Sequence, residues 1–182
     1  MKKVIFLCIF LFVLIMSVSA QFFSVNLDDS KDVVISKLEK VGLQLYKADS
    51  GDKDMLYFAT NDTITSRTIV SNLPIVDGLI IEHVEAVFSA DKLVSLQLES
   101  PSYKDNVARQ FLKWKVFEVD LINRSNSKYK DFEYIGDRFE DNSFYASAFF
   151  NKKTSTYLQI GWMVFKYKDY DEDFFFSIIW GY

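Results

Sequence analysis

His83 is the only histidine in the chain and the first residue to consider for metal binding or proton transfer. The stretch Ile81-Glu82-His83-Val84-Glu85 alternates as a β-strand does, so His83 and Glu85 would share one face. Imidazole and carboxylate are ordinary ligands of transition metals, but a site needs three or four of them. The sequence offers no third ligand, so the stretch is better explained as a solvated strand face.

Asp169, Asp171 and Asp173 alternate in the way that a calcium-binding loop begins. In such a loop the sixth position is glycine and the twelfth is glutamate. Counted from Asp169, those positions hold Phe174 and Trp180. We therefore interpret the aspartates as a charged turn that keeps two strand ends soluble.

The sequence contains none of the motifs typical of nucleophilic or metal-dependent hydrolases. There is no G-x-S-x-G or H-E-x-x-H motif, and the six glycines never form a phosphate-binding loop. The only cysteine, Cys8, lies in an N-terminal apolar run. Paired carboxylates of the glycosidase kind stay open, because 25 acidic residues offer many pairs and none stands out. We expect a non-enzymatic protein with no catalytic, cofactor-binding or metal-binding residue, and no cofactor.

The N-terminus has the pattern of a secretory signal peptide. Two lysines precede an uncharged apolar run over residues 4–16, and Ser-Val-Ser-Ala at 17–20 supplies the small residues that signal peptidase requires. A membrane anchor is the alternative, but this run is shorter than the roughly 20 residues that span a bilayer. A lipoprotein reading of Cys8 lacks a preceding cleavage site. We predict cleavage after Ala20 and a secreted or periplasmic location, with no transmembrane segment in the mature chain.

Net charge and composition argue against some classes of binding partner. Removal of residues 1–20 takes away two lysines, so the net charge moves from −4 to −6. An acidic chain without a basic stripe does not suit nucleic acid, and it does not suit anionic lipid surfaces. The mature chain has no cysteine, so its stability must come from packing, for which 17% aromatic residues provide material.

The first half of the mature chain is expected to be one helix followed by strands. Residues 29–42 carry three apolar residues at helical spacing, with Asp29 or Ser30 as the N-cap and Gly42 just past the end. Short strands follow at 43–46 and 55–59, and Pro74 and Gly78 frame a turn. The three apolar residues at helical spacing in the helix predicted at residues 29–42 are Val34, Leu38 and Val41. A hairpin of Leu79 to Phe88 and Leu93 to Glu99 closes this half, with Val94, Leu96 and Leu98 facing one way.

The second half is expected to repeat this order. Ser102 with Asp105 resembles a capping box at the start of a longer, more apolar helix, which we predict to be core. Its stripe consists of Val107, Phe111, Trp114 and Leu121, with Leu112, Val116 and Val119 beside it. Strands are expected around Phe132 to Ile135 and over Ser143 to Phe150, before a long hairpin at residues 154–182.

The two faces of the terminal hairpin carry the functional hypothesis. One alternating set can meet the helices: Leu158, Ile160, Trp162, Val164, Phe174, Phe176, Ile178 and Trp180. The residues on the opposite side should be polar if that side faces water, yet between its large side chains only Gln159 and Ser177 are polar. Either the same chain or a second copy covers that side, or it binds a partner, because a monomer rarely exposes a large apolar patch. This candidate binding face consists of Tyr157, Met163, Phe165, Tyr167, Phe175 and Ile179.

Helices and hairpins in runs, rather than in strict alternation, predict an α+β fold with an antiparallel sheet. We expect two repeats, at residues 21–100 and 101–182, each with its helix packed on one face of the sheet. Two such modules in a cysteine-free secreted chain resemble the tandem architecture of the beta-lactamase inhibitor protein fold. The resemblance covers the mature chain but rests on element order alone, and the inhibitor's disulfides are missing, so it implies no function.

Two functions fit these features. The first is a secreted or periplasmic binding module that recognises a protein, peptide or glycan through its aromatic sheet face. The second is a carrier that holds a small apolar ligand between sheet and helices. Self-association through the same face is a further possibility for the partner.

Overall fold

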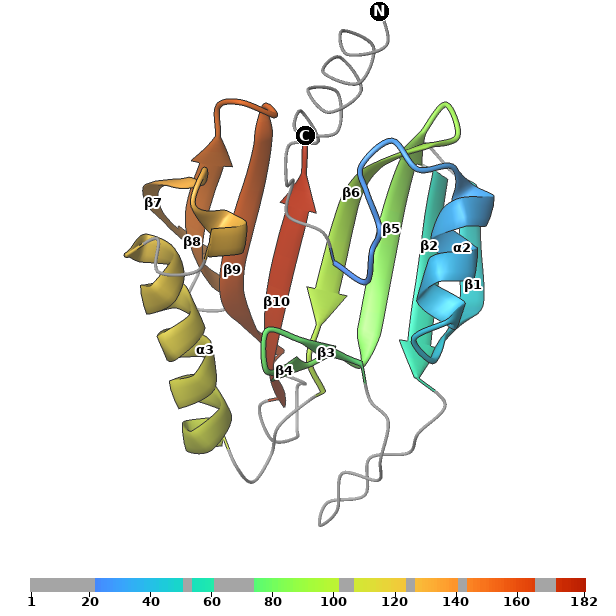
Figure 1. The fold of residues 1–182 in the computed structure, drawn as a ribbon. Coiled ribbons are helices and arrows are strands. Elements are labelled where there is room, and N and C mark those ends of the chain that lie inside the picture. The colour runs from blue at the N-terminus through green and yellow to red at the C-terminus, as the bar shows by residue number, and fades with distance from the viewer. Residues whose placement is uncertain are drawn as a thin grey trace, which may run out of the picture.

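An eight-stranded antiparallel sheet forms most of the molecule, in the strand order β1-β2-β5-β6-β10-β9-β8-β7 (Figure 1). The structure is a computed structural model that describes residues 22–50, 54–60, 74–101, 107–123, 127–140, 144–165 and 173–182. Within these ranges, the side chains of residues 50, 107–111, 127, 139–140, 163–165 and 173–174 are not described. The expected fold class, α+β with an antiparallel sheet, is confirmed.

The elements lie before and after residues 102–106, and these two groups are called here the first and the second run. The first contains the helix α2 (Lys31–Glu39) and the strands β1 (Leu43–Ser50), β2 (Asp54–Thr60), β5 (His83–Ser89) and β6 (Lys92–Glu99). The second contains α3 (Val107–Ile122), the 3-10 turn η1 (Ser127–Tyr129), β7 (Glu133–Glu140), β8 (Phe144–Asn151), β9 (Thr156–Phe165) and β10 (Asp173–Gly181). The last strands of the two runs, β6 and β10, pair at the centre of the sheet.

The terminal hairpin forms as the alternation in its sequence predicts. β9 and β10 pair from Phe165 opposite Asp173 to Tyr157 opposite Gly181. Directly opposite residues share a face of an antiparallel pair, so alternate residues separate to the two sides of the sheet. We call one side the inner face, defined by the buried Leu158, Ile160, Phe176, Ile178 and Trp180. Leu96 and Leu98 on β6 continue this face and are fully buried.

The helix α2 buries two of the three residues of the expected apolar stripe, whereas Val41 lies beyond the helix end and is only half-buried. Val34 and Leu38 are inaccessible to solvent, and the helix contacts β1 and β6. Gly42 adopts a φ of 90°, as a left-handed residue after a helix does. The expected side-chain cap is wrong, because Ser30 is the N-cap residue but its hydroxyl makes no capping hydrogen bond.

Asp29 also does not cap the helix. Its carboxylate accepts hydrogen bonds from the backbone N–H of Asn26 (2.8 Å) and from Lys37 Nζ (2.7 Å). Asp29 therefore fastens the entry loop to the side of α2 instead of to its first turn. The predicted capping pair of the second helix, Ser102 and Asp105, lies outside the described residues.

The helix α3 is only partly a core helix. Trp114 stacks on Phe176 of β10 with ring centroids 4.8 Å apart, and Phe117 and Leu121 are buried near it. The three apolar residues placed beside the stripe, Leu112, Val116 and Val119, are 48–63% exposed. The core prediction is therefore confirmed for Trp114 and wrong for this second row, and Phe111 lies outside the described side chains.

The strand expected over Leu79 to Phe88 is divided between two sheets. Leu79–Ile80 forms β4, which pairs with β3 (Ile75–Val76) in a small separate hairpin, and the large sheet resumes only at His83. Asp77 and Gly78 between β3 and β4 have φ values of 48° and 85°, which a tight two-residue turn requires.

The face assigned to Val94 is also wrong. A register shift in the β5–β6 pairing makes Phe88 partner Leu93, and Val87 partner Ser95. Leu93 therefore takes the buried position, and Val94 is only half-buried. Such a bulge adds one residue to a strand and reverses the faces that simple alternation predicts.

The small hairpin links the two runs on the inner side of the sheet. Tyr129 in η1 is fully buried and donates a hydrogen bond to Asp77 Oδ2 at 2.5 Å. Burial and this hydrogen bond raise the pKa of Tyr129. Phe22 packs against both Tyr129 and Trp180, with centroid distances of 6.4 and 5.5 Å. The core thus continues from one run into the other.

Both edge strands of the large sheet contain a register shift. On β1 it lies between Leu45 and Lys47, and on β7 it lies between Tyr134 and Gly136. Bulges of this kind disturb the row of backbone groups that an added strand would need. Among the described helices, none is both long and apolar enough to cross a membrane.

Candidate functional sites

The side of the sheet opposite the inner face, called here the outer face, is half-buried over much of its area. On β9 and β10, the outer-face residues Tyr157, Phe175 and Ile179 are partly accessible, whereas Phe176 and Ile178 of the inner face and Ser177 of the outer face are buried. The pairing continues this face through Gln97 and Glu85 to Tyr57 on β2. Large side chains that stay accessible on a sheet face can contact a partner.

Three of the six residues of the candidate binding face can be located with their side chains. These are Tyr157, Phe175 and Ile179, and the register places them together on the outer face. Met163 pairs with Phe175 on that face, and Phe165 with Asp173, but their side chains lie outside the described residues. Tyr167 lies wholly outside the described residues.

The outer face has two chemically different halves. On β8, β9 and β10 its described side chains carry no charge, and they include Phe150, Tyr157, Phe175 and Ile179. On β1, β2, β5 and β6 it carries most of the polar and charged groups. These are Gln44, Lys47, Asp49, Tyr57, His83, Glu85, Lys92, Ser95, Gln97 and Glu99.

Tyr46, Tyr57 and His83 form an aromatic group on the polar half. The ring of Tyr46 lies 6.3 Å from Tyr57 and 6.5 Å from His83, and Tyr46 is 60% exposed. The bulge on β1 brings Tyr46 into this group, because two residues of a bulge oppose one on the partner strand. Lys47 places its ammonium group 4.9 Å from the centre of the Tyr57 ring.

Burial and nearby charged groups shift two pKa values in and beside this aromatic group. Burial raises the pKa of Tyr57, and the negative charges of Glu85 and Asp49 raise it further. Burial also raises the pKa of Glu82, against the opposing effect of His83, whose Nε2 is 3.6 Å from that carboxylate. His83 and Glu85 do share the outer face, as expected. Within the described residues, no three potential ligands come together to hold a metal ion.

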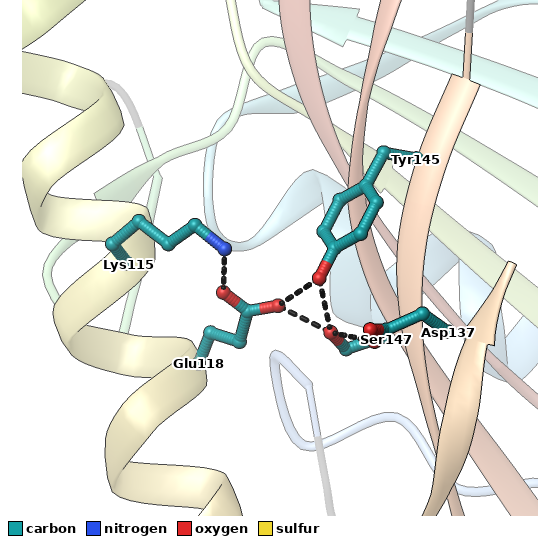
Figure 2. A network of polar contacts seen from close by, with 5 residues as sticks. All are labelled: Lys115, Glu118, Asp137, Tyr145 and Ser147. Atoms are coloured by element: carbon teal, nitrogen blue, oxygen red, sulfur yellow. Dashed lines mark hydrogen bonds and ion pairs between the residues drawn. The ribbon is translucent and has the colours of Figure 1, made fainter. Parts of the chain in front are cut away.

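A second candidate is a polar network between α3 and the inner side of β7 and β8. Figure 2 shows Lys115 and Glu118 of α3 reaching toward Tyr145, Ser147 and Asp137 on the two strands. Glu118 is only 6% exposed, and its Oε2 accepts a bond from Lys115 Nζ at 2.5 Å. Its other oxygen contacts the Tyr145 hydroxyl (3.3 Å) and Ser147 Oγ. A buried carboxylate needs such partners, so the network fastens α3 to the sheet.

The protonation of the network follows from these contacts. Burial acts to lower the pKa of Lys115, but the hydrogen bond and charge of Glu118 outweigh it, and the pKa is raised. Burial raises the pKa of Tyr145, and the hydrogen bond between its hydroxyl and Ser147 partly offsets this effect. A hydrogen bond to Asp137 raises the pKa of the exposed Tyr134 to about 12.

The network has two carboxylates but not the geometry of a glycosidase. Ser147 Oγ contacts Glu118 and also Asp137 Oδ1 (2.9 Å), so the hydroxyl occupies the space between the two carboxylates. A substrate would have to enter that space, and Ser147 is 1% exposed. Ser147 is equally inaccessible as a nucleophile and has no histidine base beside it.

A small hollow lies beside the network, between α3 and strands β8 to β10. It encloses about 240 Å³ of empty space, part of it open to solvent. The space that the centre of a water molecule can reach is only about 20 Å³, roughly room for one water, whereas ligand pockets are usually about 300–1,000 Å³. The hollow is lined by Trp114, Lys115, Glu118, Tyr145, Ile160, Gly161, Trp162 and Phe176. Its size and its charged rim do not suit a chamber for an apolar ligand.

A third candidate is the exposed row on α3. Leu112, Val116, Val119 and Ile122 are 44–63% exposed on one helix. Nothing in the described residues indicates what covers them. The row is a second exposed apolar surface of the molecule, separate from the outer face.

Sequence reasoning missed the network of Glu118 and the aromatic group of Tyr46. No local pattern marks either one, because their members come from different elements and a bulge sets the position of Tyr46. Comparison of the chain with known proteins finds no matching family model, curated protein or solved structure.

Proposed function

We propose that this protein is a non-enzymatic binding module that recognises a protein, peptide or glycan through the outer face of its sheet. The observation that carries the proposal is the accessibility of Tyr157, Phe175 and Ile179 on neighbouring strands, where alternate residues are buried. A sheet face turned only toward water would carry polar side chains there. Aromatic side chains supply contact area at low cost in conformational entropy.

We further infer that the chain contains two copies of one unit, at residues 21–100 and 101–182, with both helices on the inner face. Support comes from the element order, since each helix precedes four strands that cross one half of the large sheet. Trp114 stacks on Phe176, α2 contacts β1 and β6, and both helices are drawn on the same side of the sheet in Figure 1. The resemblance to the beta-lactamase inhibitor protein fold rests on this order alone.

We also propose export, with residues 1–20 acting as a signal peptide. The pattern of two lysines, an apolar run and small residues before Gln21 supports it. Its partners would then lie outside the cytoplasm, so they should be sought in the extracellular or periplasmic fraction.

The alternative function, a carrier of an apolar ligand, has less support. The inner side of the sheet is filled by side chains that are almost fully buried, including Phe22, Tyr129 and Trp180. The hollow beside Glu118 is small and borders a charged pair.

The test replaces Tyr157, Phe175 and Ile179 together by serine. Proteins and glycans captured from the extracellular or periplasmic fraction would be compared with those of wild type. We expect capture to be lost and the thermal midpoint to fall much less than in Phe176→Ser, a change of the neighbouring buried ring. Sedimentation of both proteins shows whether the captured partner is a second copy of the chain.

A matched control changes the exposed row on α3, with Leu112→Ser and Val116→Ser. This variant should keep its partner. Loss of capture in the α3 variant, with capture kept in the triple variant, would contradict the role of the outer face. Unfolding of the triple variant would assign those residues to the core and end the proposal.

A further inference from the structure

The polar half of the outer face is acidic. On β1, β2, β5 and β6 its described side chains include three acids, Asp49, Glu85 and Glu99, against two bases, Lys47 and, at the hairpin end opposite Ser89, Lys92. His83 lies opposite Glu99. The neighbouring half on β8, β9 and β10 has no charge among its described side chains. One continuous face therefore joins a negative region to an apolar region.

The negative region also offers exposed aromatic rings. Tyr46 is 60% exposed and lies beside Tyr57, with the carboxylate of Glu85 on the strand position opposite Tyr57. Ring faces attract cations, and the attraction adds to that of nearby carboxylates. Carboxylates beside tyrosine rings favour lysine and arginine side chains over acidic ones.

The chain itself places a cation on this surface. Lys47 Nζ lies 4.9 Å from the centre of the Tyr57 ring. An ammonium group from the neighbouring strand β1 thus already makes the contact with Tyr57 that a partner's lysine would make. Removal of Lys47 would vacate the ring and make the region more negative.

We propose that the partner bound by this face presents a basic peptide segment, whose lysine or arginine side chains contact Tyr46, Tyr57, Glu85 and Glu99 while apolar residues beside them contact Phe175 and Ile179. This rests on the proposed function and names the chemistry of its partner. Charge complementarity selects the basic segment, since an acidic one would meet three carboxylates. The segment lies across the face and does not extend the sheet, because both edge strands carry bulges.

The experiment measures fluorescence anisotropy of three labelled peptides with the full-length protein. The first alternates lysine with leucine, the second glutamate with leucine, and the third lysine with serine. We expect the lysine–leucine peptide to bind tightest and to weaken as salt is added, because exposed ion pairs are screened. The serine peptide should bind more weakly, because it cannot use the apolar half.

Three variants test which residues contact the lysine–leucine peptide. Glu85→Gln with Glu99→Gln should weaken binding of the lysine–leucine peptide by roughly two- to thirtyfold, as two partly exposed ion pairs would. The matched control, Glu39→Gln with Asp120→Asn, removes the same charge from exposed helix positions and should change binding less than about twofold. Lys47→Ala should strengthen binding by about two- to fivefold, the worth of one exposed cation–π contact.

Several outcomes would overturn the inference. One is equal affinity for the glutamate–leucine and lysine–leucine peptides. Another is an equal loss of affinity for the lysine–leucine peptide in the Glu85 and Glu99 double variant and in its Glu39 and Asp120 control, which would indicate general charge attraction. Capture of a glycan or an acidic protein that is lost in the Tyr157, Phe175 and Ile179 triple variant would refute the basic segment while the proposed function stands. Lysine–leucine binding that survives the triple variant and the Glu85 and Glu99 changes would refute both.

Discussion

Trp114 offers the most direct test of how α3 is held on the sheet. Its side chain is 4% exposed and lies nearly parallel to the ring of Phe176, with 13° between the planes and 4.8 Å between the centroids. Replacement by alanine removes this stacking and leaves a cavity, because the surrounding strands cannot collapse into the space. Such truncations of buried aromatic residues cost about 3–5 kcal/mol.

The expected change in melting temperature follows from that cost. For a domain of this size, each kcal/mol lowers the thermal midpoint by about 2–4 °C, so Trp114→Ala should melt roughly 6–20 °C below wild type. The loss is a large part of the ~5–15 kcal/mol that stabilises a typical domain. Circular dichroism at several wavelengths would follow helix and sheet separately, and both should be lost in one transition if α3 and the sheet fold as a unit.

A neighbouring residue supplies the control for this measurement. Val116 lies two positions further along the helix and is 62% exposed. Val116→Ala should change the free energy of unfolding by less than about 0.5 kcal/mol, as surface substitutions do. A Trp114→Ala protein that melts within a degree or two of wild type would refute the packing of α3 described above.

Three further predictions concern other parts of the chain. N-terminal sequencing of exported protein should begin at Gln21, and a sequence that still begins with the initiator methionine would remove the basis for export. Gly161→Ala should destabilise the protein by about 1–3 kcal/mol in chemical denaturation, because a Cβ would collide with the Tyr145 carbonyl oxygen on β8. Tyr134 should ionise near pH 12 in NMR titration, and Asp137→Asn should lower that value. Because its folded pKa lies above the usual 10, this contribution to stability is present below pH 10 and is lost as the pH rises toward 12.

Local alternation predicted five buried residues of the terminal hairpin, whereas Trp162 is only half-buried and the side chains of Val164 and Phe174 are not described. Leu158, Ile160, Phe176, Ile178 and Trp180 are buried as expected, because side chains on a strand change sides at every residue. The same argument failed at Val94, where a bulge adds a residue and Leu93 takes the core position. Bulges depend on the partner strand, so periodicity within one strand cannot locate them.

The sequence by itself therefore determined the fold class, the helix α2 with its buried stripe, and the two faces of β9 and β10, since these follow from the spacing of apolar residues along one segment. Only the tertiary structure decided which side of α3 is covered, because docking against Phe176 chose Trp114 and left Val116 exposed. It also brought Glu118 together with strand residues about thirty positions away, and Tyr46 together with His83. The physical reason is that a buried carboxylate or an aromatic group is defined by partners from other elements, and no single segment of sequence contains them.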